Sequence, residues 1–168
     1  PSRMRSGPYD LVLNVGIAGS FRSDWEPGMV VRVVEEAFGD MGVQKETGYQ
    51  TMFEAGFWKA QAVPFKKGKL VPLMDKRWLG GLDHLPEARG LTVNMVSESR
   101  DHAQLKYERF KADVETMEGA AIMEQVPVLQ IRAVSNRVGD RDPDHWNVPL
   151  AADRLAAVVL QYLDALEP

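Results

Sequence analysis

Apolar, strand-like segments alternate along this chain with segments of helical pattern, and this alternation limits its fold more than any other feature. Residues 10–16 (DLVLNVG) form an apolar run that ends in glycine and is typical of a buried strand. Further strands are predicted at residues 29–34 (MVVRVV), 90–96 (GLTVNMV), 112–115 and 127–135 (PVLQIRAVS). Strands that alternate with helices indicate an α/β fold whose sheet is covered on both faces.

Helices are predicted between and after these strands. Residues 98–110 indicate a polar helix, and residues 117–125 (MEGAAIMEQ) a helix rich in alanine and methionine. The last helix follows Asn147, an N-cap residue, and has Pro149 in its first turn. Its apolar positions recur at i, i+4, i+7 and i+11, namely at Leu155, Val159, Tyr162 and Leu166.

Two further segments have weaker patterns. Residues 61–65 and 70–73 predict short paired strands around the turn at residues 66–68 (KKG). Residues 136–146 predict a long polar loop.

Composition limits the class of protein. A length of 168 residues predicts one domain, residues 1–168. The absence of cysteine excludes a disulfide framework, a cysteine-ligated zinc and a cysteine nucleophile. The net charge of -4 and the pI of 5.4 argue against nucleic-acid and anionic-membrane partners. No apolar run approaches the roughly 18 residues of a spanning helix. We therefore expect a cytoplasmic protein.

Metal ligands are not arranged as known metal motifs require. His84, His102 and His145 are far apart in the sequence, which argues against a zinc site. Residues 140–144 (DRDPD) resemble the start of a calcium loop, but His145 and Ala151 stand where that loop needs Gly and Glu. We expect neither a metal nor a cofactor.

Small residues follow the first predicted strand. Gly16-Ile17-Ala18-Gly19 matches neither a Walker loop nor a dinucleotide fingerprint. Its small side chains would let a ligand approach the backbone N–H groups, although a plain tight turn is the alternative interpretation. In α/β sheets ligands bind beyond the carboxyl ends of the strands. The candidate loops are therefore residues 16–20, residues 96–99 and the segment from Ser135 onward.

Glu118 and Asn136 also stand where a predicted element begins or ends. Glu118 opens a helix otherwise made of small apolar residues. A carboxylate at that position could bind a ligand or could simply favour the helix dipole. Asn136 directly follows a strand and is either a turn residue or a ligand contact.

The combination of three segments is more specific than any of them alone. Residues 14–21 (NVGIAGSF), 114–121 (VETMEGAA) and 132–136 (RAVSN), in this order, resemble the nucleoside phosphorylase/nucleosidase family, which includes methylthioadenosine nucleosidases and purine nucleoside phosphorylases. Residues 93–97 (VNMVS) and 146–150 (WNVPL) resemble the futalosine hydrolases of menaquinone biosynthesis most. The resemblance implies a three-layer sandwich of the purine nucleoside phosphorylase type, in which helices flank a central mixed sheet.

The resemblance also implies an activity, hydrolysis of the N-glycosidic bond of a 6-oxopurine nucleoside such as futalosine. Glu118 and Asn136 would be the catalytic residues. The Glu118 carboxylate can accept hydrogen bonds from the 2′- and 3′-hydroxyls of ribose. Adenosine-type relatives carry an aspartate at the position of Asn136 that protonates N7. An asparagine can instead accept from N7–H and donate to a 6-oxo group, which suits hypoxanthine better than adenine.

Six further residues would form the substrate pocket by the same resemblance. Met117 would pack on the sugar or the base. The others are Ile17, Ala18, Gly19, Val96 and Ser135. Family members also have strands and turns before the strand that matches residues 10–16, and these usually carry the glutamate that activates water. This chain shows no counterpart, so we expect an N-terminally truncated domain.

Two other functions remain open at this level. The first is another enzyme of the family, either a purine nucleoside phosphorylase, although no clear set of arginines for phosphate is visible, or a methylthioadenosine/S-adenosylhomocysteine nucleosidase. The second is an inactive fragment or a nucleoside-binding module without the water-activating acid. The expected partner is a small-molecule purine nucleoside, and the resemblance implies a homo-oligomer.

Overall fold

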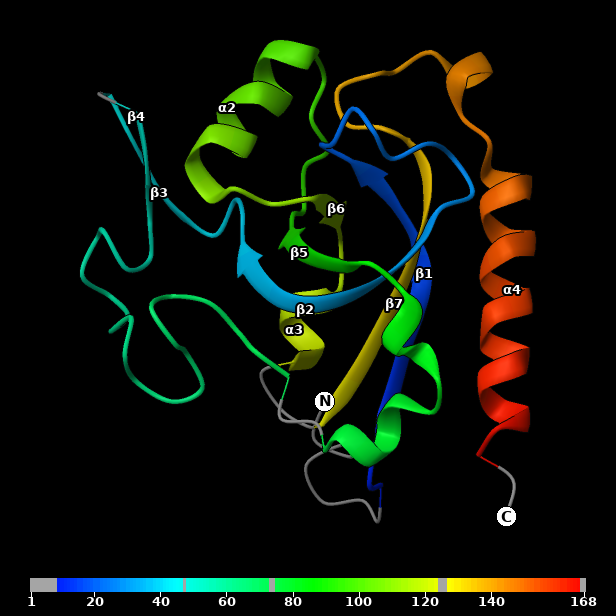
Figure 1. Ribbon diagram of the computed structural model, residues 1–168. Helices are drawn as coiled ribbons and strands as arrows, with labels where there is room; N and C mark the ends of the chain where they lie inside the picture. The colour runs from blue at the N-terminus through cyan, green and yellow to red at the C-terminus, as the bar shows by residue number, and fades with distance from the viewer. Residues whose placement is uncertain (1–8, 47, 73–74, 124–126, 167–168) are drawn as a thin grey trace.

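Five strands pair into one mixed sheet that closes on itself. The computed structural model describes residues 9–46, 48–72, 75–123 and 127–166. The strands are β1 (Val12–Ser20), β2 (Val30–Phe38), β5 (Glu87–Thr92), β6 (Val114–Thr116) and β7 (Val128–Arg137). Their order around the closed barrel is β1-β6-β5-β2-β7, with parallel and antiparallel pairs (Figure 1). The predicted α/β class and mixed sheet are confirmed.

Closure of the sheet depends on the end of β1. Residues 12–18 of β1 pair with β7, and a register shift follows between Ala18 and Gly19. Gly19 and Ser20 then pair with β6 as well as with β7. The prediction that residues 16–20 form a loop was therefore wrong, because pairing with two neighbours continues the strand through Ser20. The predicted loop at residues 136–146 likewise begins too early, since β7 continues to Arg137.

Helices and a separate hairpin complete the fold. The helices are α2 (Arg100–Phe110), α3 (Gly119–Met123) and α4 (Val148–Asp164), with 3₁₀ turns η1 (Lys76–Leu79), η2 (Leu82–His84) and η3 (Pro143–His145). A two-stranded sheet is formed by β3 (Gly42–Lys45) and β4 (Gly48–Thr51). Of the predicted helix at residues 117–125, positions 124 and 125 lie outside the described residues. Within the described ranges, no helix has both the length and the apolar character needed to cross a membrane.

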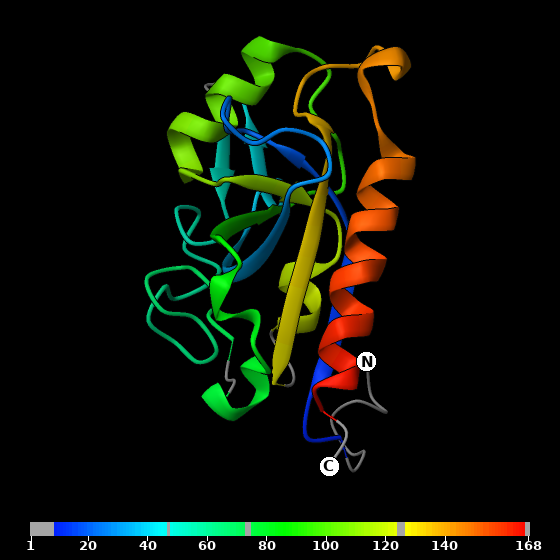
Figure 2. The same cartoon turned by 45° about the vertical axis from the view of Figure 1, so that its right-hand side comes forward.

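The C-terminal helix α4 lies along the outside of β1 and β7 in both views (Figures 1 and 2). Its predicted cap is confirmed, because Asn147 Oδ1 accepts from the Leu150 N–H at 3.1 Å. Leu155 and Tyr162 are buried against the sheet. Leu166 lies beyond the helix end and is exposed, so its predicted place on the apolar face was wrong.

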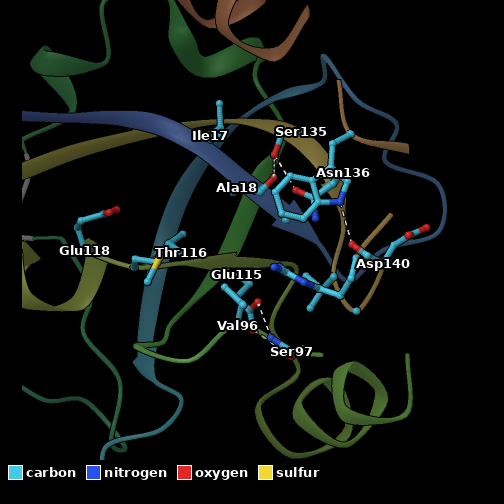
Figure 3. A pocket seen from close by; sticks show the side chains of 16 residues that line it. Ile17, Ala18, Val96, Ser97, Glu115, Thr116, Glu118, Ser135, Asn136 and Asp140 are labelled. Carbon is cyan, nitrogen blue, oxygen red and sulfur yellow. Dashed lines mark hydrogen bonds between the residues drawn. The ribbon is translucent and has the colours of Figure 1, made fainter. Parts of the chain in front are cut away.

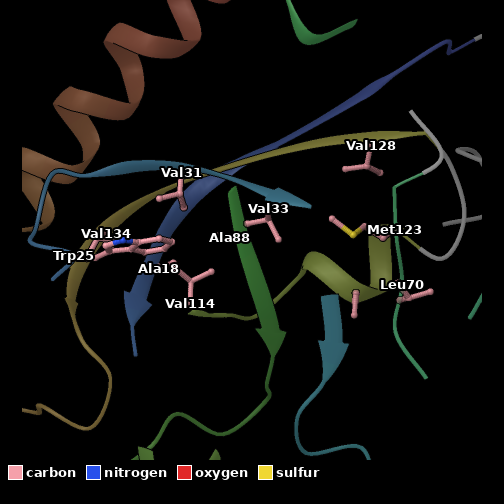
Figure 4. Close-up of a cluster of buried hydrophobic side chains, with 11 residues drawn as sticks. Ala18, Trp25, Val31, Val33, Leu70, Ala88, Val114, Met123, Val128 and Val134 are labelled. Atoms are coloured by element: carbon pink, nitrogen blue, oxygen red, sulfur yellow. The ribbon is translucent and has the colours of Figure 1, made fainter. Parts of the chain in front are cut away.

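Strand β7 is buried on both faces, and successive side chains point in opposite directions. Leu129, Ile131 and Ala133 belong to the cluster that packs under α4. Val128 and Val134 belong to the cluster inside the barrel (Figure 4). The same alternation turns the two polar residues between them, Gln130 and Arg132, toward the barrel interior.

Strand β2 contains a bulge that changes which acid faces inward. Val31 and Val33 lie in the interior cluster, and strict alternation would place Glu35 beside them. The register with β5 shifts between Val33 and Glu35, and such an extra residue reverses the alternation. Glu36 is consequently fully buried, whereas Glu35 pairs with Lys69 at the surface.

The predicted hairpin at residues 61–65 and 70–73 was wrong. In the described part of these segments only isolated bridges occur, Glu36 with Leu70 and Lys66 with Lys69, and Leu73 lies outside the described residues. Phe65 instead packs edge-on against Phe53 at 5.0 Å between ring centroids and stacks on Trp58. Aromatic packing, rather than strand pairing, shapes this region.

Candidate functional site

The structure brings all eight predicted site residues to one cavity, at the carboxyl ends of β1, β6 and β7 (Figure 3). The cavity has a volume of about 220 Å³. Its wall consists of the predicted residues Ile17, Ala18, Gly19, Val96, Met117, Glu118, Ser135 and Asn136, together with Ser97, Glu115, Thr116, Val138, Gly139, Asp140, Arg141 and Trp146. The chemical roles of the eight residues remain predictions. The wrong loop assignment for residues 17–19 does not change their place, because they lie on the last part of β1.

Glu118 and Asn136 lie on opposite sides of the cavity (Figure 3). The Glu118 side chain is 59% exposed, and its Oε2 accepts from Arg132 Nη2 at 3.1 Å. The Arg132 side chain is 2% exposed and also donates to Asn14 Oδ1 at 3.0 Å. Burial lowers the pKa of Arg132, while the charges of Glu118 and Glu36 oppose that shift. A buried guanidinium needs acceptors, so it fixes the carboxylate at the cavity edge.

Gly16 makes room for this guanidinium. Gly16 on β1 is the register partner of Arg132 on β7. A Cβ atom at position 16 would lie 2.2 Å from Arg132 Nη1. The sequence placed Gly16 in a candidate ligand-binding loop. In the structure it instead makes room for the Arg132 side chain inside the barrel.

The Asn136 amide is held in one orientation. Its Nδ2 donates to the Arg137 carbonyl at 2.9 Å, and its Oδ1 accepts from Ser135 Oγ at 2.7 Å. A carbonyl oxygen cannot donate, so the NH₂ group must face Arg137. Each amide atom keeps capacity for one more hydrogen bond, because NH₂ carries a second hydrogen and the oxygen a second lone pair.

Lys106 on α2 fixes the part of the cavity wall that contains Glu115 and Val96. Lys106 Nζ donates to Glu115 Oε2 at 2.9 Å and to the Met95 carbonyl at 3.0 Å. Ser97 Oγ also donates to Glu115 Oε2, at 3.2 Å. These contacts hold the segment that carries Val96, which is 47% exposed and lines the cavity. The predicted strand at residues 90–96 ends earlier, at Thr92, so Val96 lies in a loop.

The segment after β7 closes one side of the cavity. Trp146 Nε1 donates to the Asp140 carbonyl at 2.8 Å, and the Arg141 guanidinium lies 5.2 Å from the Trp146 ring centroid. His145 Nδ1 and Asp140 Oδ2 are 2.9 Å apart. That hydrogen bond raises the pKa of His145 and lowers the pKa of Asp140. The acidic run at residues 140–144 thus forms local turns, in which Asp142 caps η3.

Sequence reasoning assigned no role to several residues that shape the site. The most informative are Arg132 and Glu115, which control Glu118 and the Val96 segment. A signal for Arg132 existed, because a charged residue inside the apolar strand at residues 127–135 must find a partner. Glu115 had no comparable local signal.

A second hollow of about 1080 Å³ lies between α2 and the β3–β4 hairpin. It contains none of the predicted site residues. Its lining includes Tyr49, Met95, Leu105 and Arg109. Within the described ranges, no three His, Asp or Glu side chains come together as metal ligands would.

Comparison with known proteins gives a consistent result. The family model described as the phosphorylase superfamily matches residues 4–164. Futalosine hydrolase of Thermus thermophilus is 31% identical over 161 residues, which cover 93% of this chain and 70% of that protein. Futalosine hydrolase of Streptomyces coelicolor is 31% identical over 166 residues, which cover 95% of this chain and 68% of that protein. The family resemblance seen in the sequence is confirmed.

Solved structures show the same fold. The native structure of futalosine hydrolase of Helicobacter pylori matches with a TM-score of 0.75 and 16% identity, over 98% of this chain and 72% of that one. A methylthioadenosine/S-adenosylhomocysteine nucleosidase of Colwellia psychrerythraea, solved with adenine, matches with a TM-score of 0.72 and 21% identity, over 98% and 70%.

Proposed function

Because this chain belongs to the phosphorylase superfamily, with futalosine hydrolases among its relatives, we propose that it hydrolyses the N-glycosidic bond of a 6-oxopurine nucleoside. Futalosine is the proposed substrate, and hypoxanthine is the released base. The proposed setting is menaquinone biosynthesis in the cytoplasm. The single observation that carries the proposal is the placement of Glu118 and Asn136 across one small cavity, as a ribose contact and a base contact require.

Glu118 is the proposed ribose contact. N-glycoside cleavage passes through a cationic, oxocarbenium-like sugar, as glycoside hydrolysis does. A carboxylate that accepts from the 2′- and 3′-hydroxyls both holds the sugar and offsets its developing positive charge. Arg132 keeps Glu118 Oε2 in place, so the carboxylate is oriented for the ribose hydroxyls before the substrate binds. Met117, half exposed next to Glu118, supplies an apolar contact.

Asn136 is the proposed base contact. Its Oδ1 would accept from N7–H of the leaving base, and its Nδ2 would donate to the 6-oxo group. Adenine has a donor at its 6-position and would meet the NH₂ group donor to donor. Turning the amide over would remove that conflict but would break the hydrogen bond to Arg137. The hydrogen bond from Asn136 to the Arg137 carbonyl therefore supports a preference for 6-oxopurines.

Hydrolysis, rather than phosphorolysis, is supported by the charges around the cavity. Among the described residues that line it, Arg141 is the one lysine or arginine. The nearby Arg132 does not line the cavity, and its Nη2 donates to Glu118 and Asn14. A phosphate co-substrate is normally held by several cationic or N–H donors, and this wall offers few cations.

The carboxylates of the cavity wall are each engaged in the described structure. Glu118 contacts Arg132, Glu115 contacts Lys106, and Asp140 contacts His145. The group that activates water is therefore proposed to be none of Glu115, Glu118 and Asp140.

Release of hypoxanthine from futalosine, with and without inorganic phosphate, tests the proposal. Chromatography separates the base from the nucleoside, and the sugar product shows which nucleophile attacked. We expect equal rates in phosphate-free and phosphate-containing buffer, with a free reducing sugar as the second product. Strict dependence on phosphate would establish a phosphorylase instead. Binding of nucleoside without any base release would establish a binding module.

A further inference from the structure

Four buried polar side chains form a hydrogen-bonded row across the barrel interior, which we call the interior relay: Arg132, Asn14, Gln130 and Glu36. Arg132 Nη2 donates to Asn14 Oδ1 at 3.0 Å. Asn14 Nδ2 donates to Gln130 Oε1 at 2.9 Å, and Gln130 Nε2 donates to Glu36 Oε1 at 2.7 Å. The Arg132 end contacts Glu118 at the cavity. Glu36 itself does not line the cavity, although Thr116, which donates to its Oε1, does.

The interior relay can run in only one direction. A guanidinium only donates hydrogen bonds, so Asn14 must present its oxygen to Arg132 and its NH₂ group to Gln130. Gln130 must then accept with its oxygen, which turns its own NH₂ group toward position 36. An acceptor is required there, because a buried donor left unpaired is costly.

The surroundings of Glu36 are built around a carboxyl group. Glu36 Oε1 also accepts from Thr116 Oγ1 at 3.0 Å, and Oε2 accepts from Thr92 Oγ1 at 3.0 Å. Cβ atoms at Gly90 and Gly119 would lie 2.3 Å and 2.1 Å from Glu36 Oε1. Neither position can carry a larger residue without moving this side chain.

We propose that Glu36 is a positioning residue for the Glu118 carboxylate and acts through the interior relay. The inference rests on the proposed role of Glu118 as the ribose contact. An acceptor at position 36 fixes the orientation of Gln130 and hence that of Asn14. Without it, both amides can turn over to satisfy the Gln130 NH₂ group. Asn14 would then present its own NH₂ group to Arg132, donor against donor, and the guanidinium that holds Glu118 would lose its second anchor.

Two substitutions at position 36 separate this role from simple support of the fold. Glu36→Gln keeps an oxygen for Gln130 and offers an NH₂ group to Thr92, so the relay keeps its direction. Glu36→Leu removes the acceptor at similar volume. Thr92→Ser is the control, since it alters packing beside Glu36 and keeps the hydroxyl that donates to Glu36 Oε2 and accepts from the Ala120 N–H.

The measurement is the ratio of kcat/KM for inosine to that for 2′-deoxyinosine, because the second nucleoside lacks one hydroxyl that Glu118 would bind. We expect Glu36→Leu to lower this ratio by about 10- to 100-fold, the range for one hydrogen bond to a charged group. Glu36→Gln and Thr92→Ser should keep the ratio within about threefold of the native value, inside the usual scatter of a single hydrogen bond. A folded Glu36→Leu protein with an unchanged ratio overturns the proposal.

Two further measurements keep the test decisive. If Glu36→Leu does not fold, Gln130→Met cuts the interior relay at the next member and carries the same expectation and the same contradicting result. If the native protein releases no base from any nucleoside, the proposed function fails. The ratio of the calorimetric Kd for 2′-deoxyinosine to the Kd for inosine then tests the relay, with a fall expected in Glu36→Leu and an unchanged ratio as the contradicting result.

Discussion

The Arg132 guanidinium, enclosed in the barrel, holds the Glu118 carboxylate at the cavity edge through an Nη2–Oε2 contact of 3.1 Å. Arg132 is 2% exposed and Glu118 is 59% exposed at the side chain. A rigid interior group thus positions a solvent-accessible functional group. Effects on the site can therefore originate from residues that never touch a ligand.

Glu118→Gln should lower kcat/KM for a 6-oxopurine nucleoside by about two to three powers of ten, on the order of 3–4 kcal/mol, as expected for loss of a charged transition-state contact. The amide still accepts from Arg132, so the fold should be kept. Steady-state kinetics check this value, with Glu98→Gln as the exposed control that does not line the cavity. Kinetics of Glu118→Gln close to those of the native protein would remove Glu118 from its proposed role.

Gly16→Ala should impair activity through Arg132. The new Cβ would lie 2.2 Å from Nη1, so the guanidinium must move away from its two acceptors. We expect kcat/KM to fall at least about tenfold, the effect of losing one hydrogen bond to a charged group. Because both changes act on the same contact, Gly16→Ala in a Glu118→Gln background should cost little more. If the losses in kcat/KM from Gly16→Ala and Glu118→Gln were fully additive, Gly16→Ala would not act through the Arg132–Glu118 contact.

The stability of the protein should depend on pH through Glu36. Burial raises the pKa of Glu36 from 4.5 to about 7, opposed by hydrogen bonds from Gln130, Thr92 and Thr116 and by the charge of Arg132. Between these two pH values the unfolded chain has released the proton and the folded protein retains it, so folded stability falls as pH rises. The fall is on the order of 3 kcal/mol and ends near pH 7.

Urea unfolding between pH 4.5 and pH 8 checks this prediction against Glu36→Gln, which cannot titrate. Among the described side chains facing Glu36, Thr92 on β5, Thr116 on β6 and Gln130 on β7 are neutral, and Arg132 supplies the nearby charge. The native protein should therefore lose stability relative to the variant as pH rises from 4.5 to 7. A difference that stays constant across this range would show that Glu36 does not titrate there.

His145 should titrate above its ordinary pKa of 6.5, because it is hydrogen bonded to Asp140. The stabilisation of that contact is present below pH 6.5 and is lost as pH rises through the raised pKa. NMR titration should show the pKa moving down toward 6.5 in Asp140→Asn. Asp144→Asn, which removes the weakest of the contributing charges, is the control. An unchanged pKa in Asp140→Asn would assign the shift to another group.

Local patterns in the sequence were sufficient to predict the elements that bury a regular set of apolar residues. The apolar run of β7, the cap of α4 and the buried positions Leu155 and Tyr162 each depend on neighbouring residues alone. The eight predicted site residues were chosen because family motifs mark them, and the fold brings them to the wall of one cavity.

Long-range pairing explains what the sequence could not show. The barrel closes where Gly19 and Ser20 pair with two strands at once, and nothing in residues 16–20 indicates the second partner. Glu36 faces inward, and Glu35 outward, because of a bulge between Val33 and Glu35 whose position depends on the register with β5. Adjacent glutamates are indistinguishable in the sequence, so the interior relay could be recognised only in three dimensions.

The most direct test of the account is the choice of base by Asn136. The measurement compares release of hypoxanthine from futalosine with release of adenine from its 6-amino analogue, at equal concentrations, for the native protein and for Asn136→Asp. Paired hydrogen bonds in a site can reject a mismatched analogue by as much as about 10⁴–10⁵. We expect the native protein to favour futalosine strongly, and Asn136→Asp to narrow or invert that preference, because a carboxyl group can accept from the amino group and supply a proton to N7. A native preference for the 6-amino nucleoside, or a ratio that Asn136→Asp leaves unchanged, would contradict the account.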